Sequence, residues 1–115
     1  MSTRVDFYIE ISKCRIDRQE EIEKSLKGQF EYKFSVGVTA DNGTDGNHQH
    51  MDIRAEGTFS GDSEEIAEEL TKDIWLANGE YCNIKIEMCF LDYCPKDNYE
   101  GDPDAYNRFV QENKA

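Results

Sequence analysis

Two histidines near the middle of the chain are the residues whose spacing most suggests metal chemistry. His48 and His50 are separated by one residue, and in an extended segment residues i and i+2 point to the same side. Zinc or copper would require two more ligands, and Asp52 or a cysteine from elsewhere could supply them. The chain has no C-x-x-C and no H-x₃-H spacing. The pattern therefore favours two solvent-exposed histidines, and a metal site at His48 and His50 is the weaker hypothesis.

Nucleophilic catalysis would need a serine or cysteine, a base, and a third group that orients the base. Cys94 could meet a histidine in the folded chain, but no local motif points to it. Phosphate-binding glycine loops are absent, and the carboxylates are too numerous for the sequence to single out a general acid. The segment 41–47 lacks the spacing and the closing Glu of a calcium loop. We therefore expect a protein that is not an enzyme and that needs no cofactor.

Acidic side chains are abundant and unevenly spread. The 115 residues include 25 acids and 13 bases, which gives a net charge of −12. Residues 1–60 carry 11 acids and 8 bases, a net charge of −3, and residues 61–115 carry 14 acids and 5 bases, a net charge of −9. Phosphate backbones and anionic lipid surfaces repel such a protein. The charge argues against direct binding to nucleic acid or membranes, and favours a basic protein partner.

The densest acidic segment is 61–80, which is a predicted helix. Ile66, Leu70 and Ile74 form its inward stripe, and this leaves most of its carboxylates toward solvent. Glu65 and Glu69 are like charges four residues apart, which is slightly destabilising. Tolerance of that repulsion suggests a binding role, although solubility explains many such faces. The predicted partner-binding residues of this helix are Glu64, Glu65, Glu68, Glu69 and Asp73.

A second acidic group lies in the C-terminal tail, where the acids alternate with tyrosines. Such a surface can pair with arginine and lysine and can also bury aromatic area. A solvated acidic tail is an equally good interpretation. The predicted partner-binding residues of the tail are Asp92, Asp97, Tyr99, Glu100, Asp102 and Asp104.

Alternating apolar and polar residues predict four strands, over 5–12, 30–38, 51–59 and 81–90. A capping box at 17–20 predicts a helix that ends near Gly28, and a second capping box at 62–65 predicts a helix that ends at Asn78 and Gly79. Segment 41–47 predicts a mobile loop between two antiparallel strands. Pro103 after Asp102 predicts a short terminal helix.

This order of elements predicts an α+β fold of β-α-β-β-α-β type. We expect a ferredoxin-like, four-stranded antiparallel sheet with two helices on one face. The domain would span 1–94, and 95–115 would be an acidic C-terminal extension with a short helix, which either packs on the sheet or binds a partner.

The uncovered face of this sheet could bind RNA if it carried aromatic side chains. Only Tyr8 could stack a base there, and the RNA-recognition signature is missing. Mixed charges that pair across strands are the simpler interpretation. The side chains expected on this face are those of Tyr8, Glu10, Glu31, Lys33, Asp52, Arg54, Glu56, Lys85 and Glu87.

The compartment follows from what the sequence lacks. It has no run of 18 apolar residues and no signal-peptide hydrophobic region after Met1. We therefore expect Cys14, Cys82, Cys89 and Cys94 to be free thiols, in a protein of the cytoplasm of a host bacterial cell.

The size, the compact α/β pattern and the acid-rich stretches 62–80 and 92–104 resemble, at class level, the small acidic anti-CRISPR and anti-restriction proteins of phages and mobile elements. The resemblance implies inhibition of a basic nucleic-acid-binding protein or ribonucleoprotein complex by DNA mimicry, with carboxylates in its Lys/Arg channel. It implies no catalytic residue. Two other hypotheses are a small metal- or ligand-binding domain centred on His48 and His50, and a homodimer formed through the sheet face.

Overall fold

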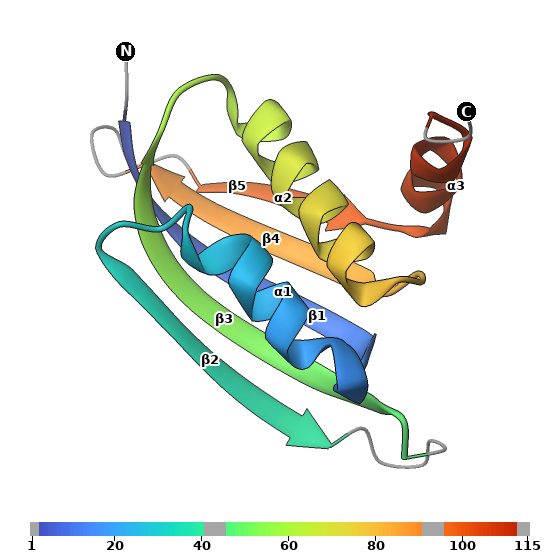
Figure 1. Ribbon diagram of the computed structural model, residues 1–115. Coiled ribbons are helices and arrows are strands. Elements are labelled where there is room, and N and C mark those ends of the chain that lie inside the picture. Colours follow the sequence, from blue (N-terminus) through green and yellow to red (C-terminus); the bar gives the residue numbers. More distant parts are fainter. Residues whose placement is uncertain (1–2, 41–45, 91–95, 113–115) are drawn as a thin grey trace.

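The computed structural model describes residues 3–40, 46–90 and 96–112 (Figure 1). Its strands are β1 (Thr3–Arg15), β2 (Lys33–Ala40), β3 (His48–Phe59), β4 (Asn83–Phe90) and β5 (Lys96–Gly101). Its helices are α1 (Gln19–Lys27), α2 (Ser63–Asn78) and α3 (Pro103–Glu112), and a short 3₁₀ turn (Ile16–Arg18) precedes α1. No helix of the described part is long and apolar enough to cross a membrane.

The five strands form one antiparallel sheet in the order β2-β3-β1-β4-β5. The helices α1 and α2 lie side by side across one face of it (Figure 1). The predicted α+β class, with an antiparallel sheet and two helices on one face, is confirmed. The prediction of four strands is wrong, because the tail adds β5 beside β4, and the four-stranded ferredoxin-like description is therefore not confirmed.

The core lies between the sheet and the two helices. Inward residues of β1 alternate with outward ones, so that Val5, Ile9 and Ile11 are fully buried. Ile22 and Leu26 of α1 pack onto the same core. Period-two burial in the strands and period-four burial in the helices therefore produce the one-sided packing, as the apolar pattern predicts.

The caps of α2 agree with the sequence pattern. The carboxylate of Asp62 accepts a hydrogen bond from the Glu65 N–H at 2.9 Å, and Gly79 ends the helix in the left-handed conformation with φ of 79°. The capping box predicted for α1 is wrong. Arg18 is the residue before α1, and no side chain caps that end.

A bulge interrupts β1 near its end. The register between β1 and β3 shifts between Ile11 and Cys14, and Lys13 has φ of 62°. Within the described ranges, Lys13 is the one residue other than glycine with positive φ. Positions like this are uncommon for side-chain-bearing residues and store backbone strain.

The tail packs on the domain over residues 96–112. Phe109 of α3 is buried, with its ring centroid 5.4 Å from that of Trp75 in α2. Gly101 allows the close approach of β5 and α2, because a Cβ at that position would lie 2.8 Å from Cγ2 of Thr71. The predicted boundary between 94 and 95 falls on residues that the structure does not describe.

Candidate functional site

The face of the sheet opposite α1 and α2, here called the open face, carries the most concentrated set of polar side chains. Residues that are directly opposite on neighbouring strands point to the same side of the sheet. The register therefore builds rows of side chains that cross the strands. One row contains Asp52, Glu10, Lys85 and Glu100, and the next contains Arg54, Tyr8, Glu87 and Asn98.

Two like charges are neighbours in the first row. Glu10 of β1 lies directly opposite Asp52 of β3, and such a like-charge pair is destabilising in a sheet. Lys85 lies opposite Glu10 on the other side, and it is also opposite Glu100. The row thus contains one ammonium group and three carboxylates. Its net charge is negative, which favours the binding of a cation.

Tyr8 lies at the centre of the open face. Its hydroxyl donates a hydrogen bond to Oδ1 of Asp52 at 3.3 Å. The guanidinium of Arg54 lies over its ring, 4.6 Å from the centroid. Burial, followed by the charge of Asp52, raises the pKa of the Tyr8 hydroxyl. Tyr8 is therefore a protonated donor at neutral pH.

Two adjoining hollows flank Tyr8. The smaller, here called the Tyr8 groove, has a volume of about 330 Å³, and its polar lining comes from Tyr8, Glu10, Lys85, Glu87, Asn98 and Glu100. The larger, of about 450 Å³, is lined by Tyr8 and Glu87 again, together with Asp6, Lys33, Arg54 and Cys89. Both volumes lie in the range of small-molecule sites. The Tyr8 groove combines an aromatic ring with three carboxylates and one ammonium group.

Sequence periodicity identified the side chains of the open face but not their arrangement. The predicted outward position is confirmed for all but one of that set, because Glu31 precedes β2 and is not in a strand. The juxtaposition of Glu10 with both Asp52 and Lys85 was missed. It depends on the strand order and register, which alternation within one strand does not specify.

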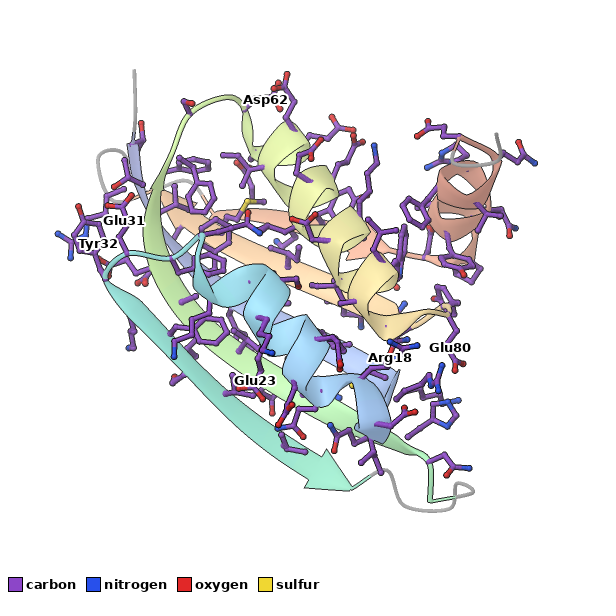
Figure 2. All side chains as sticks on the ribbon, in the orientation of Figure 1. Arg18, Glu23, Glu31, Tyr32, Asp62 and Glu80 are labelled. Atoms are coloured by element: carbon purple, nitrogen blue, oxygen red, sulfur yellow. The ribbon has the colours of Figure 1, made fainter. Side chains whose placement is uncertain are left out.

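The acids predicted on α2 lie on the helix side of the sheet, away from the open face. Glu64, Glu65 and Glu69 are exposed, and Glu68 is half-buried. Asp73 accepts a hydrogen bond from Nε2 of Gln29 at 3.0 Å, and burial raises its pKa. Figure 2 shows Asp62 at the start of α2 and Glu80 beyond its end. Asp73 thus contacts a residue just beyond the end of α1, and it also lies near enough to Glu69 for that charge to raise its pKa further.

The acids predicted in the tail are also divided. Asp102 caps α3 by accepting a hydrogen bond from the Ala105 N–H at 2.8 Å, and Asp104 is exposed in the first turn of α3. Glu100 lies on the open face, whereas Asp97 is opposite the buried Met88 and so lies on the helix side. Asp92 is outside the described residues.

Tyr99 lies on the helix side of β5, opposite the buried Ile86. Burial, followed by the charge of Glu68, raises the pKa of its hydroxyl. The charges of Glu64 and Asp102 also act on Tyr99, so acids of α2 and of the tail lie near one another on the helix side, whereas Glu100 lies on the open face.

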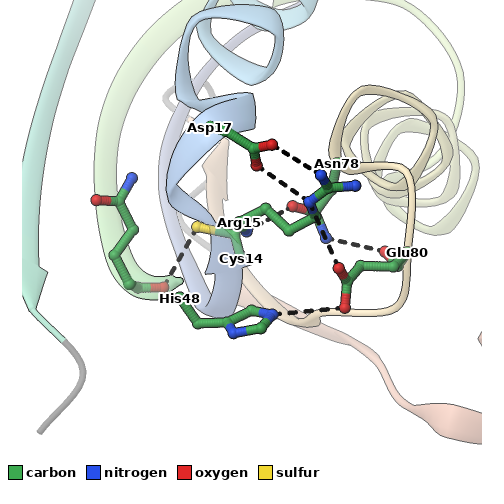
Figure 3. A network of polar contacts seen from close by, with 7 residues as sticks. Cys14, Arg15, Asp17, His48, Asn78 and Glu80 are labelled. Atoms are coloured by element: carbon green, nitrogen blue, oxygen red, sulfur yellow. Dashed lines mark hydrogen bonds and ion pairs between the residues drawn. The ribbon is translucent and has the colours of Figure 1, made fainter. Parts of the chain in front are cut away.

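The two histidines have different partners. Nε2 of His50 lies 2.9 Å from Oδ1 of Asp52, and Nε2 of His48 lies 3.5 Å from Oε2 of Glu80 (Figure 3). Over residues 3–40, 46–90 and 96–112, no group of three or more His, Cys, Asp or Glu side chains could hold a metal ion. A metal site at His48 and His50 stays a prediction without support from this arrangement.

The contacts around His48 join the end of β1 to the end of α2 (Figure 3). The buried Asn78 accepts a hydrogen bond from the Arg15 N–H at 2.8 Å and donates one to the carbonyl of Glu80 at 2.9 Å. The Arg15 guanidinium also binds Asp17 at 2.7 Å. This network is structural, because its central residue satisfies two backbone groups.

No protein-family model and no curated protein sequence matches the chain. Among solved structures, the chain is similar to a phage S-adenosylmethionine (SAM) lyase in complex with S-methyl-5'-thioadenosine. The TM-score is 0.46 and the identity 10%, and the match covers 84% of this chain and 88% of the lyase chain.

This comparison corrects the expectation of a non-enzymatic inhibitor that mimics DNA. The similar protein is a SAM lyase, which is an enzyme. At this TM-score and identity the similarity does not assign the lyase reaction to this chain.

Proposed function

We propose that the Tyr8 groove is the active site of an enzyme that acts on a small organic cation. The observation that carries the proposal is the lining of this groove. Tyr8 offers an aromatic ring, Glu10, Glu87 and Glu100 offer carboxylates, and Lys85 is the single cationic group of the lining. An excess of carboxylates around an aromatic ring is an arrangement that recognises onium cations.

The expected affinity of such a groove is modest. A cation over a tyrosine ring contributes up to about 2 kcal/mol when partly desolvated, and each exposed ion pair contributes at most about 1 kcal/mol. One ring and three carboxylates therefore sum to at most about 5 kcal/mol, which corresponds to a dissociation constant of about 0.2 mM or higher. Lys85 would at the same time attract a carboxylate on the ligand, so that a zwitterion fits the groove better than a simple cation.

The groove also carries the groups for proton transfer. The carboxylate of Glu10 is a candidate general base, and the protonated hydroxyl of Tyr8 is a candidate donor. An onium group leaves as a neutral molecule, so its elimination needs a base alone. Glu10 would take the proton from a carbon adjacent to the one that bears the onium group, the C–H electron pair would form a C=C bond, and the onium group would leave with the electrons of its bond to carbon.

The test is turnover of a panel of onium compounds, with S-adenosylmethionine and choline as the first two, followed by mass spectrometry. We expect one member to be consumed by the wild type and at least about 100-fold more slowly by Glu10→Gln, in line with the usual contribution of a general base. Glu21→Gln, an exposed carboxylate on α1 at the other face of the sheet, is the matched control and keeps the wild-type rate. Equal rates for the wild type and Glu10→Gln would refute the proposal.

Three further predictions stand beside this proposal. A basic protein partner for the acidic residues of α2 and the tail stays a prediction, and so does a homodimer through the open face. The described cysteines Cys14, Cys82 and Cys89 are free. Free thiols are typical of reducing compartments, and they support the inference that the protein acts in the cytoplasm.

A further inference from the structure

Three side chains at one end of the open face form a chain of polar contacts. Oγ of Ser12 lies 3.3 Å from Nδ1 of His50, and Nε2 of the same ring lies 2.9 Å from Oδ1 of Asp52. All three residues are half-buried. A hydroxyl, an imidazole and a carboxylate are therefore in contact in the order that nucleophilic catalysis requires.

The carboxylate defines the role of each ring nitrogen. Because Asp52 is an acceptor, the neutral His50 ring carries its proton on Nε2 and has its lone pair on Nδ1. That lone pair faces Ser12, so the serine hydroxyl donates to it. Asp52 is itself held in place, because the Tyr8 hydroxyl donates to the same Oδ1 at 3.3 Å.

The backbone of β1 is irregular next to Ser12. This residue precedes Lys13, which has φ of 62°, and it lies in the stretch where the β1–β3 register shifts. Bulges redirect side chains and occur next to active sites, and strained backbone conformations of this kind cost about 1–3 kcal/mol and cluster at functional positions. The bulge is an observation independent of the three side-chain contacts.

We propose that Ser12 is a nucleophile, activated by His50 and oriented through Asp52, that acts on carboxylic esters. Oγ forms a bond to the carbonyl carbon of the ester while its proton passes to Nδ1 of His50. The bond from that carbon to the alcohol oxygen then breaks, and the departing alcohol takes the proton from His50. Water hydrolyses the acyl-serine by the same proton route, and Asp52 stays ionised throughout.

This inference goes beyond the proposed function and does not depend on a cation in the Tyr8 groove. Its test uses a fluorophosphonate probe, which bonds to the oxygen of an activated serine with loss of fluoride. We expect the probe to label the full chain, and peptide mapping to place the adduct on Ser12. Ser12→Ala abolishes labelling, and His50→Ala slows it at least about 100-fold, since a general base contributes about 10²–10⁴-fold.

The matched control is Ser35→Ala, an exposed serine on the same face in β2, the strand that pairs with β3. It keeps the wild-type labelling rate. Because the adduct is mapped on the wild-type protein, the assignment of Ser12 as the nucleophile is tested even if a variant fails to fold. An adduct on another residue, or no adduct at Ser12 with excess probe on folded protein, would overturn the assignment.

Discussion

The guanidinium of Arg54 lies 4.6 Å from the centroid of the Tyr8 ring, and the two residues are directly opposite each other in β3 and β1. The protein thus already uses this ring to hold a cation. Arg54 lines the larger of the two hollows beside Tyr8, whereas the Tyr8 groove is lined by Lys85 and carboxylates. A cationic ligand in the groove would therefore meet the same ring without contact with the arginine.

Two substitutions of Tyr8 distinguish the contribution of its ring to binding from that of its hydroxyl. In Tyr8→Phe the ring remains, so we expect the affinity for an organic cation to change by less than about 3-fold. In Tyr8→Ala the ring is lost, and the dissociation constant rises by about 2- to 30-fold, as a cation–π contribution of about 0.5–2 kcal/mol implies. Calorimetric titration measures both. Equal affinities for the two variants would show that the ring does not contact the ligand.

Asn78 stabilises the junction of β1 and α2. Its side chain satisfies the Arg15 N–H and the Glu80 carbonyl, and it is fully buried. We expect Asn78→Ala to lower the free energy of unfolding by about 2–3 kcal/mol, because buried polar groups lose their partners. Urea unfolding measures the change. The control Asn107→Ala, an exposed residue of α3, stays within about 0.5 kcal/mol of the wild type.

Thr71 of α2 contains a buried hydroxyl that lacks a hydrogen-bond partner among the described residues. Thr71→Val keeps the shape of the side chain and removes this polar atom. We expect the free energy of unfolding to rise by about 1 kcal/mol, and Tm to rise by about 4 °C. Thermal unfolding followed by circular dichroism measures the shift. The exposed Thr39→Val serves as the comparison, and an equal gain there would exclude the buried hydroxyl as the cause.

The cysteines differ in burial, and we therefore expect them to differ in reactivity toward alkylating reagents. Burial raises the pKa of the Cys14 thiol to about 11 and also raises the pKa of the Cys82 thiol, whereas Cys89 is half-exposed. Only the thiolate reacts with alkylating reagents. At pH 8 we therefore expect Cys89 to be alkylated before Cys14 and Cys82, in a chain in which Cys94 is replaced by serine. Peptide mapping over time gives the order, and equal rates would contradict it.

The raised pKa of the Cys14 thiol also makes the free energy of unfolding depend on pH. The unfolded chain ionises the Cys14 thiol near its ordinary pKa of 9.0, whereas the folded chain keeps the proton up to about 11. The unfolded state then binds fewer protons in this window, so stability falls as pH rises from about 9 to about 11. Cys14→Ala shows a shallower fall over that window than the wild type.

Much of the fold follows from local pattern. The inward stripe of α2 and its caps at Asp62 and Gly79 were visible in the sequence, because helix periodicity and caps are short-range features. The strand β5 was not visible. Its residues Lys96–Gly101 are mostly poor strand formers, and among them only Tyr99 contributes a large side chain to the helix side. Pairing with β4 stabilises it, and such a tertiary contact leaves no local signal.

The sequence predicted which residues lie at the candidate site, but not which of them contact one another. Alternation placed Tyr8, Glu10 and Asp52 on the open face, but their contacts depend on β1 lying between β3 and β4. Local acid density in the sequence also does not show which face of the sheet an acid occupies. Glu100 and Asp97 are three residues apart in the sequence and lie on opposite faces of the sheet, so a run of acids in a strand is not a single acidic surface.

Binding in the Tyr8 groove is tested most directly by an NMR titration of labelled protein with matched charged and neutral molecules. S-adenosylmethionine and choline are the cations, and S-adenosylhomocysteine, which lacks the sulfonium charge, is the neutral counterpart of the first. We expect a cation to shift the resonances of Tyr8, Glu10 and Lys85 with a dissociation constant of about 0.2 mM or higher, and we expect loss of the onium charge to weaken binding by at least about 3-fold. No shift at these residues up to about 10 mM of either cation, or equal affinity for the neutral counterpart, would contradict it.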